Sequence, residues 1–141
     1  MLKACEALPL EDHPRLILEL YYKGDNREKQ AVLRTLIFLP SPDRFVQVGI
    51  EACRSHVQTV FEALACENPY PAAHFTDLHY NQMVLKALFT GAPMERILGW
   101  KERNNSELVR MATDFADERK AAKRSVPEDI QKIIDHARSK S

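Results

Sequence analysis

The sequence predicts an all-α fold in which antiparallel helical hairpins stack into an α-solenoid. Three observations support this prediction: an internal sequence echo, helical spacing of apolar residues along most of the chain, and no period-two stretch bounded by turn residues. In the echo, residues 30–37 (QAVLRTLI) recur 52 residues later as residues 82–89 (QMVLKALF). Each copy is followed by a proline and an acid-arginine pair, which are Pro42 with Asp43-Arg44 and Pro93 with Glu95-Arg96. Such a degenerate repeat is typical of stacked hairpins, and about seven or eight helices fit the chain.

The first half of the chain divides into four predicted helices, the first of which opens near residues 11–14 and ends at Gly24. The next three helices are predicted to begin at N-terminal capping signals. These signals are Asp25 with Glu28, Ser41 with Pro42, and Ser55 with Gln58. Capping boxes and a proline in the first turn are typical of helix N-termini. We place a break before Ser55 because Val57 and Val60 start an apolar stripe in a rotated register.

The second half begins with a predicted linker at residues 68–71 (NPYP), because two prolines exclude a continuous helix. A new helix is expected near Asp77, with Asp77 as its N-cap. The remaining signals are a helix end at Gly91, a short helix between Pro93 and Gly99, a cap at Asn104 with Glu107, and a terminal helix after Ser125 or Val126 with Pro127. These signals complete a chain made of helices and short connections.

Length and charge exclude several functional classes. A chain of 141 residues fits one domain, residues 1–141, with a single core. Its longest apolar run is too short to cross a bilayer and its first residues lack a signal-peptide pattern, so we expect a cytoplasmic protein without membrane insertion. The 20 basic and 20 acidic residues leave no net charge. A nucleic-acid-binding domain normally carries a basic excess, so nucleic acid is not an expected partner.

Few residues suggest chemistry. Cys5, Cys53 and Cys66 are odd in number and lack the close pairing of a zinc or redox site, so we interpret them as reduced thiols. His74 and His79 flank Asp77, but a spacing of five separates side chains on a helix by about 140°, unlike helical ligand pairs. The sequence therefore predicts no catalytic residue, no metal site and no cofactor.

A set of polar residues forms the candidate binding site. The apolar stripe that ends at Phe115 continues geometrically onto Glu118 and Arg119, and charges on a buried face need partners. One interpretation is a structural ion-pair cluster with Arg54 or Glu51. The other is a polar pocket for a carboxylate or phosphate ligand. The candidate ligand-binding residues are Arg54, Asn81, Gln82, Lys86, Glu118 and Arg119, with Tyr70, Phe75 and Trp100 either walling the pocket or packing under a loop.

Several strings resemble the EboA family. They are residues 68–75 (NPYPAAHF), residues 80–89 (YNQMVLKALF), residues 117–127 (DERKAAKRSVP), Cys53-Arg54-Ser55 and Glu62-Ala63-Leu64. Together they cover about residues 25 to 130, and they are more specific as a set than singly. The family's closing motif has a small residue, often glycine, where this chain has Lys123.

This resemblance implies an all-helical, HEAT-like fold and a role in making or moving a secondary-metabolite precursor. Implied partners are products of the same gene cluster, which include a prenyltransferase-like membrane protein and metal-dependent hydrolase-like enzymes. We therefore expect a non-catalytic interaction scaffold. The alternative is an anionic-metabolite carrier, or a helical enzyme, that uses the polar pocket on the concave face. The resemblance also leaves open that residues 1–141 are the C-terminal part of a longer family member.

Overall fold

The computed structural model describes residues 13–39 and 41–140, and over these residues all regular secondary structure is helical and there is no strand. The all-α prediction is therefore confirmed. The nine α-helices within the described part are α2 (His13–Lys23), α3 (Asn26–Thr35), α4 (Val46–Cys53), α5 (Gln58–Ala65), α6 (Tyr70–His74), α7 (Asp77–Thr90), α8 (Trp100–Arg103), α9 (Ser106–Ala121) and α10 (Glu128–Lys140). Three 3₁₀ turns join them at Leu36–Phe38, Pro42–Phe45 and Met94–Arg96. None of the described helices is long and apolar enough to span a membrane.

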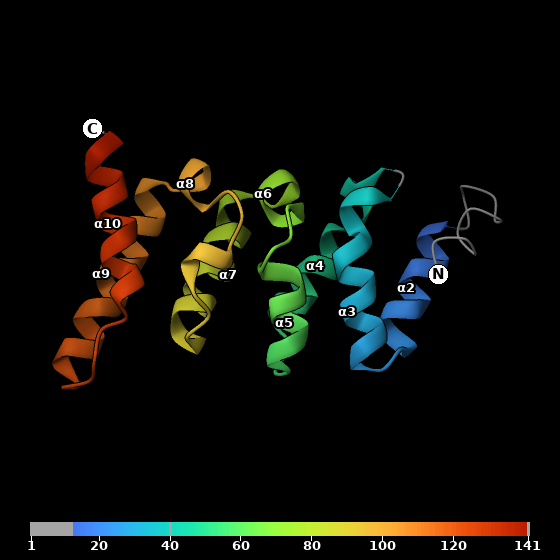
Figure 1. The fold of residues 1–141 in the computed structure, drawn as a ribbon, viewed down its shortest axis with the longest axis horizontal. Coiled ribbons are helices and arrows are strands. Elements are labelled where there is room, and N and C mark those ends of the chain that lie inside the picture. The colour runs from blue at the N-terminus through green and yellow to red at the C-terminus, as the bar shows by residue number, and fades with distance from the viewer. Residues whose placement is uncertain (1–12, 40, 141) are drawn as a thin grey trace.

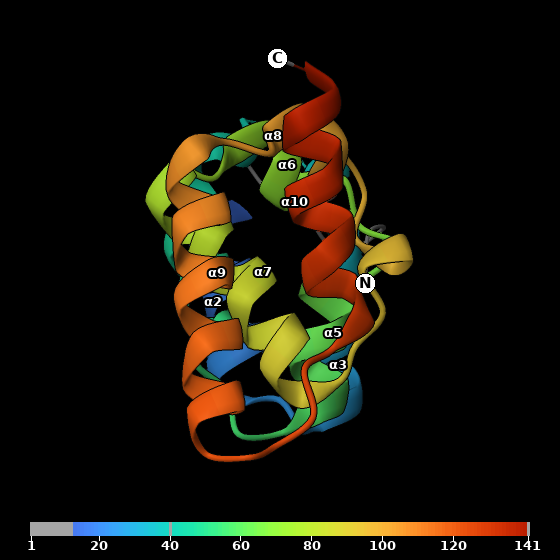
Figure 2. The ribbon, with the colours of Figure 1, turned by 90° about the vertical axis from the view of Figure 1, so that its left-hand side faces the viewer.

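The helices form a row along the long axis of the molecule, from α2 at one end to α9 and α10 at the other (Figure 1). Contacts follow this order, because α2 packs on α3, α3 on α5, α5 on α4 and α7, α7 on α9, and α9 on α10. Seen along the row, α3 and α5 lie on the same side as α10, and α2 lies on the same side as α9 (Figure 2). The longer helices thus bury apolar residues against their neighbours in the row.

The two copies of the sequence echo place equivalent residues in the core. Val32 in α3 and Val84 in α7 are buried at matching positions, and so are Leu36, in the 3₁₀ turn directly after α3, and Leu88 in α7. A proline and a 3₁₀ turn follow each copy. The echo therefore reflects a repeated local structure whose apolar positions are fixed by packing.

Several helices begin at a side chain that accepts a hydrogen bond from a backbone N–H of the first turn, which would otherwise have no partner. The capping box predicted at α3 is confirmed, since the Glu28 N–H donates to Asp25 Oδ1 at 2.9 Å and the Asp25 N–H donates to Glu28 Oε1 at 3.4 Å. The break between α4 and α5 is also confirmed. Its predicted capping box is wrong, because Ser55 Oγ accepts from the Val57 N–H at 3.1 Å and Gln58 is already the first helical residue.

Three further boundary predictions are wrong by a short distance. The predicted linker at residues 68–71 contains the start of α6, because a proline in the first turn, here Pro71, lacks only an N–H that would have no helical partner. Thr76 rather than Asp77 caps α7, accepting from the His79 N–H. Asn105 rather than Asn104 caps α9, accepting from the Leu108 N–H at 2.9 Å. At α7 and α9, two neighbouring residues offered a similar cap, and local spacing did not distinguish them.

A left-handed residue ends α9. Lys123 has φ of +58°, its N–H donates to the Lys120 carbonyl at 3.0 Å, and the Arg124 N–H donates to the Arg119 carbonyl at 2.8 Å. These two bonds form a Schellman motif, which usually has glycine at the left-handed position. The small residue that the family resemblance implies at this position therefore suits the backbone better than lysine does.

We expect Lys123→Gly to stabilise the protein by about 1 kcal/mol at most, because the left-handed conformation disfavours a residue with a Cβ. Urea unfolding followed by helical circular dichroism should show a higher midpoint with an unchanged slope. Lys120→Gly, inside α9, is the matched control and should lower the midpoint. A lower urea midpoint for both variants would contradict the left-handed conformation of Lys123.

Candidate functional site

An open groove runs beside α7 and has a volume of about 590 Å³. The end of α4, the start of α5, α7 and α9 contribute its walls. The residues that define this α7 groove are Arg54, Gln82, Leu85, Lys86, Phe89 and Phe115. Its volume lies in the range of small-molecule sites. Among the described residues, no aspartate or glutamate lines it.

A smaller pocket of about 80 Å³ continues the α7 groove toward the start of α7. The two share Arg54 and Gln82, and the extension reaches Phe75 and His79 without adding an acidic residue from the described chain. His79, Gln82 and Phe89 are spaced by three and seven residues, so they lie along one face of α7. The groove is therefore a continuous strip along that helix.

Lys86 holds a fixed positive charge in the wall of the groove. Its ammonium donates to the Cys53 carbonyl at 2.5 Å and to the Ser55 carbonyl at 2.7 Å, and it lies 4.7 Å from the centre of the Phe61 ring. These carbonyls belong to the end of α4 and the turn after it, where a cation is favourable. Burial lowers the pKa of Lys86 from its ordinary value. Among the described residues, the Lys86 ammonium contacts two backbone carbonyls and the Phe61 ring, but no carboxylate.

Arg54 is the second cation of the groove and lies at its rim. Its side chain is exposed and makes no hydrogen bond or ion pair with the described residues. Arg103, in contrast, donates to the Ala72 carbonyl at 2.6 Å and pairs with Asp77 at 3.1 Å. Arg54 thus presents hydrogen-bond donors to solvent, and Gln82 is exposed beside it.

Two aromatic side chains, Phe89 and Phe115, line the groove. Phe89 is 72% exposed although it is a large apolar residue, and its ring centre lies 6.0 Å from that of Phe115 at an angle of 58°. Leu85 lines the same wall. The candidate set from the sequence omitted both phenylalanines. The signal that could have found Phe89 is its spacing of three and seven residues from Lys86 and Gln82 on α7.

Asn81 belongs to the core rather than to the groove. It is 1% exposed, and its amide exchanges two hydrogen bonds with Asn105, at 3.1 and 2.9 Å. Because Asn105 also caps α9, this pair joins α7 to the start of α9. Asn81 is therefore separated from Gln82, which points to the surface one residue later.

Glu118 and Arg119 do not lie on a buried face, so that part of the sequence interpretation is wrong. The buried stripe of α9 ends at Ala116, and Glu118 is exposed. Arg119 Nε donates to the Ser125 carbonyl at 2.7 Å and its guanidinium lies 5.9 Å from the Phe115 ring centre. It pairs with neither Arg54 nor Glu51 but fixes the turn before α10. Of the six candidate residues, the structure brings Arg54, Gln82 and Lys86 together.

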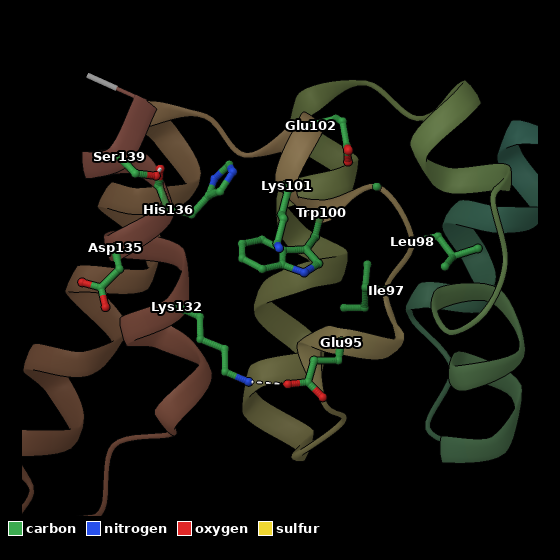
Figure 3. Close-up of a pocket in the computed structure, with 11 residues that line it drawn as sticks. Glu95, Ile97, Leu98, Trp100, Lys101, Glu102, Lys132, Asp135, His136 and Ser139 are labelled. Atoms are coloured by element: carbon green, nitrogen blue, oxygen red, sulfur yellow. Dashed lines mark hydrogen bonds and ion pairs between the residues drawn. The ribbon is translucent and has the colours of Figure 1, made fainter.

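A second groove of about 760 Å³ lies between α8 and α10, with the Trp100 ring at its centre (Figure 3). Its charged groups are of both signs and several are already paired. Lys132 contacts Glu95 at 2.8 Å and Asp129 at 3.2 Å, and the His136 ring packs on Trp100 at 5.3 Å. Tyr70 is fully buried, and its hydroxyl donates to the Pro42 carbonyl. Tyr70 therefore does not line this groove.

The residues with metal-binding or nucleophilic potential are used in packing. His74 lies 4.9 Å from the Tyr70 ring centre, and His79 lies 6.3 Å from that of Phe75. No group of three potential metal ligands occurs in the described residues. Burial raises the pKa of the Cys53 thiol to about 12 and also raises that of Cys66, so both remain thiols at neutral pH. Cys5 lies outside the described residues.

The model of a family described as "Metabolite traffic protein EboA" matches residues 6–135. No curated protein and no solved structure matches the chain.

Proposed function

This chain belongs to the EboA family, and we propose that it serves the traffic of a metabolite as a non-catalytic binding module. In this proposal the row of helices is a HEAT-like α-solenoid. It acts in the cytoplasm as an interaction scaffold for proteins that make or move a secondary-metabolite precursor, encoded in the same gene cluster. Stacked hairpins commonly present extended binding surfaces of this kind.

The α7 groove is the observation that carries the proposal. It combines an exposed aromatic residue, Phe89, with the free donors of Arg54 on a surface that the fold itself leaves uncovered. Aromatic and arginine side chains are the usual anchors of binding interfaces.

A small-molecule carrier is the second candidate function. The observation that favours it is the charge of Lys86, which the described residues contact only through carbonyl dipoles and a ring. A partly buried cation without a carboxylate partner attracts an anion. A helical enzyme has less support, because Cys53, which lines the extension of the groove, is held as a thiol by its raised pKa.

The test is an affinity purification from the source cell, with mass spectrometry of both bound proteins and extracted small molecules. We expect Phe89→Ser to lose a partner that wild type recovers in stoichiometric amount. Phe38→Ser is the matched control, because Phe38 is 76% exposed but does not line the groove. Equal recovery from both variants would contradict a role for the α7 groove. Recovery of one enriched small molecule without a protein would favour the carrier.

A further inference from the structure

We propose that the α7 groove binds an amphipathic organic anion, with an apolar ring system against Phe89 and Phe115 and an acidic group at Arg54. This inference rests on the proposed binding function and adds the chemical class of the ligand. It requires three properties of the groove: an uncompensated positive potential, an available anion receptor and an apolar surface of the right size.

The groove has a positive potential because basic side chains line it and no described acidic side chain does. The whole chain has 20 basic and 20 acidic residues, yet the described walls of the groove and of its extension contain Arg54 and Lys86 without any carboxylate. The Lys86 ammonium is immobilised by two carbonyls, so it provides a fixed charge rather than a flexible contact. An anion in the groove therefore meets attraction that no acidic wall residue opposes.

Arg54 is suited to bind the acidic group directly. Its guanidinium is exposed and carries several N–H donors that no described acceptor uses. A planar guanidinium binds carboxylate, sulfonate or phosphate oxygens through two parallel hydrogen bonds, which are stronger than neutral ones. The fixed Lys86 charge and the free Arg54 donors thus have different roles in the same groove.

The apolar part of the ligand fits the two aromatic residues that line the groove. The Phe89 and Phe115 rings are inclined at 58° and leave much of Phe89 open to solvent. A flat ring system would cover this exposed face, and burial of apolar area is favourable. A volume of about 590 Å³ accommodates one small organic molecule of this kind.

Two fluorescent dyes test the inference: anilinonaphthalene sulfonate, and the neutral N-phenylnaphthylamine, which has the same ring system without the acid. We expect one sulfonate dye per folded chain, bound about tenfold more tightly than the neutral dye. Arg54→Gln should remove this difference by weakening the sulfonate alone. Phe89→Ser should weaken both dyes. Arg110→Gln, which removes an exposed arginine outside the groove, should change neither.

Urea midpoints of all variants must match wild type, because the dyes also bind partly unfolded protein. Equal affinity for the two dyes, or sulfonate binding that survives Phe89→Ser, would overturn the assignment. The proposed function fails separately, by the affinity purification: if Phe89→Ser still loses a protein partner while no dye binds, the groove is a protein-docking surface. That outcome rejects the anionic ligand and retains the scaffold.

Discussion

Asn68→Ala should destabilise the protein by about 3 kcal/mol or more, because it leaves three buried backbone groups without a partner. Asn68 is 3% exposed. Its amide donates to the carbonyls of Leu33 at 2.9 Å and Ala63 at 3.1 Å, and its oxygen accepts from the Tyr70 N–H at 3.0 Å. The two carbonyls belong to the last turns of α3 and α5, which have no partner within their own helices. One side chain thus joins three consecutive parts of the row.

Urea unfolding followed by helical circular dichroism measures this effect as a lower midpoint. Asn26→Ala, at an exposed position at the start of α3, is the control and should leave the midpoint close to that of wild type. Asn68→Asp tests the two amide N–H donors of Asn68 separately from its oxygen acceptor. It keeps an oxygen for the Tyr70 N–H but places a carboxylate against two carbonyls, so we expect a loss at least as large at neutral pH. A small effect of both substitutions would mean that water replaces the amide.

Apolar periodicity made most of the fold predictable from the sequence. The echo of residues 30–37 in residues 82–89 identified matching core positions, and glycine, proline and the Asp25 capping box located most helix ends. The errors occurred where two neighbouring residues could cap the same helix, as with Asn104 and Asn105. Asn104 instead donates to the Ile133 carbonyl of α10 at 3.1 Å. Only tertiary packing distinguishes the two asparagines.

The candidate site was predictable only where helical spacing determined it. Gln82 and Lys86 lie four residues apart on one α7 face, and both line the groove. Asn81, one residue away, faces the core, and a single residue rotates a helix position by about 100°. The position of Arg54 beside Gln82 and Lys86 depends on the tertiary contact between the end of α4 and α7, which helical spacing does not determine. Extending the α9 stripe to Glu118 failed because the buried surface ends at Ala116, which sequence periodicity does not show.

Arg103→Met should destabilise the protein by about 3 kcal/mol, because one guanidinium joins α8 to the end of α6 and the start of α7. It donates to the carbonyls of Ala72 at 2.6 Å and Phe75 at 2.7 Å, and to Asp77 Oδ1 at 3.1 Å. The same group lies 4.7 Å from the centre of the Tyr80 ring. Methionine keeps the apolar stem but leaves the carbonyls unpaired in a partly buried place. Lowered urea midpoints at an unchanged slope would report this loss.

Arg103→Lys distinguishes the geometry of the guanidinium from its charge. A lysine ammonium is a single point of charge and cannot reach two carbonyls and a carboxylate in the arrangement of a planar fork. We therefore expect lysine to recover less than half of the stability that methionine loses. Arg110→Met removes an exposed arginine of α9 and should leave the midpoint unchanged. If lysine restored full stability, positive charge near the end of α6 would be sufficient, and the pattern of donors would not be what holds α8 to the row.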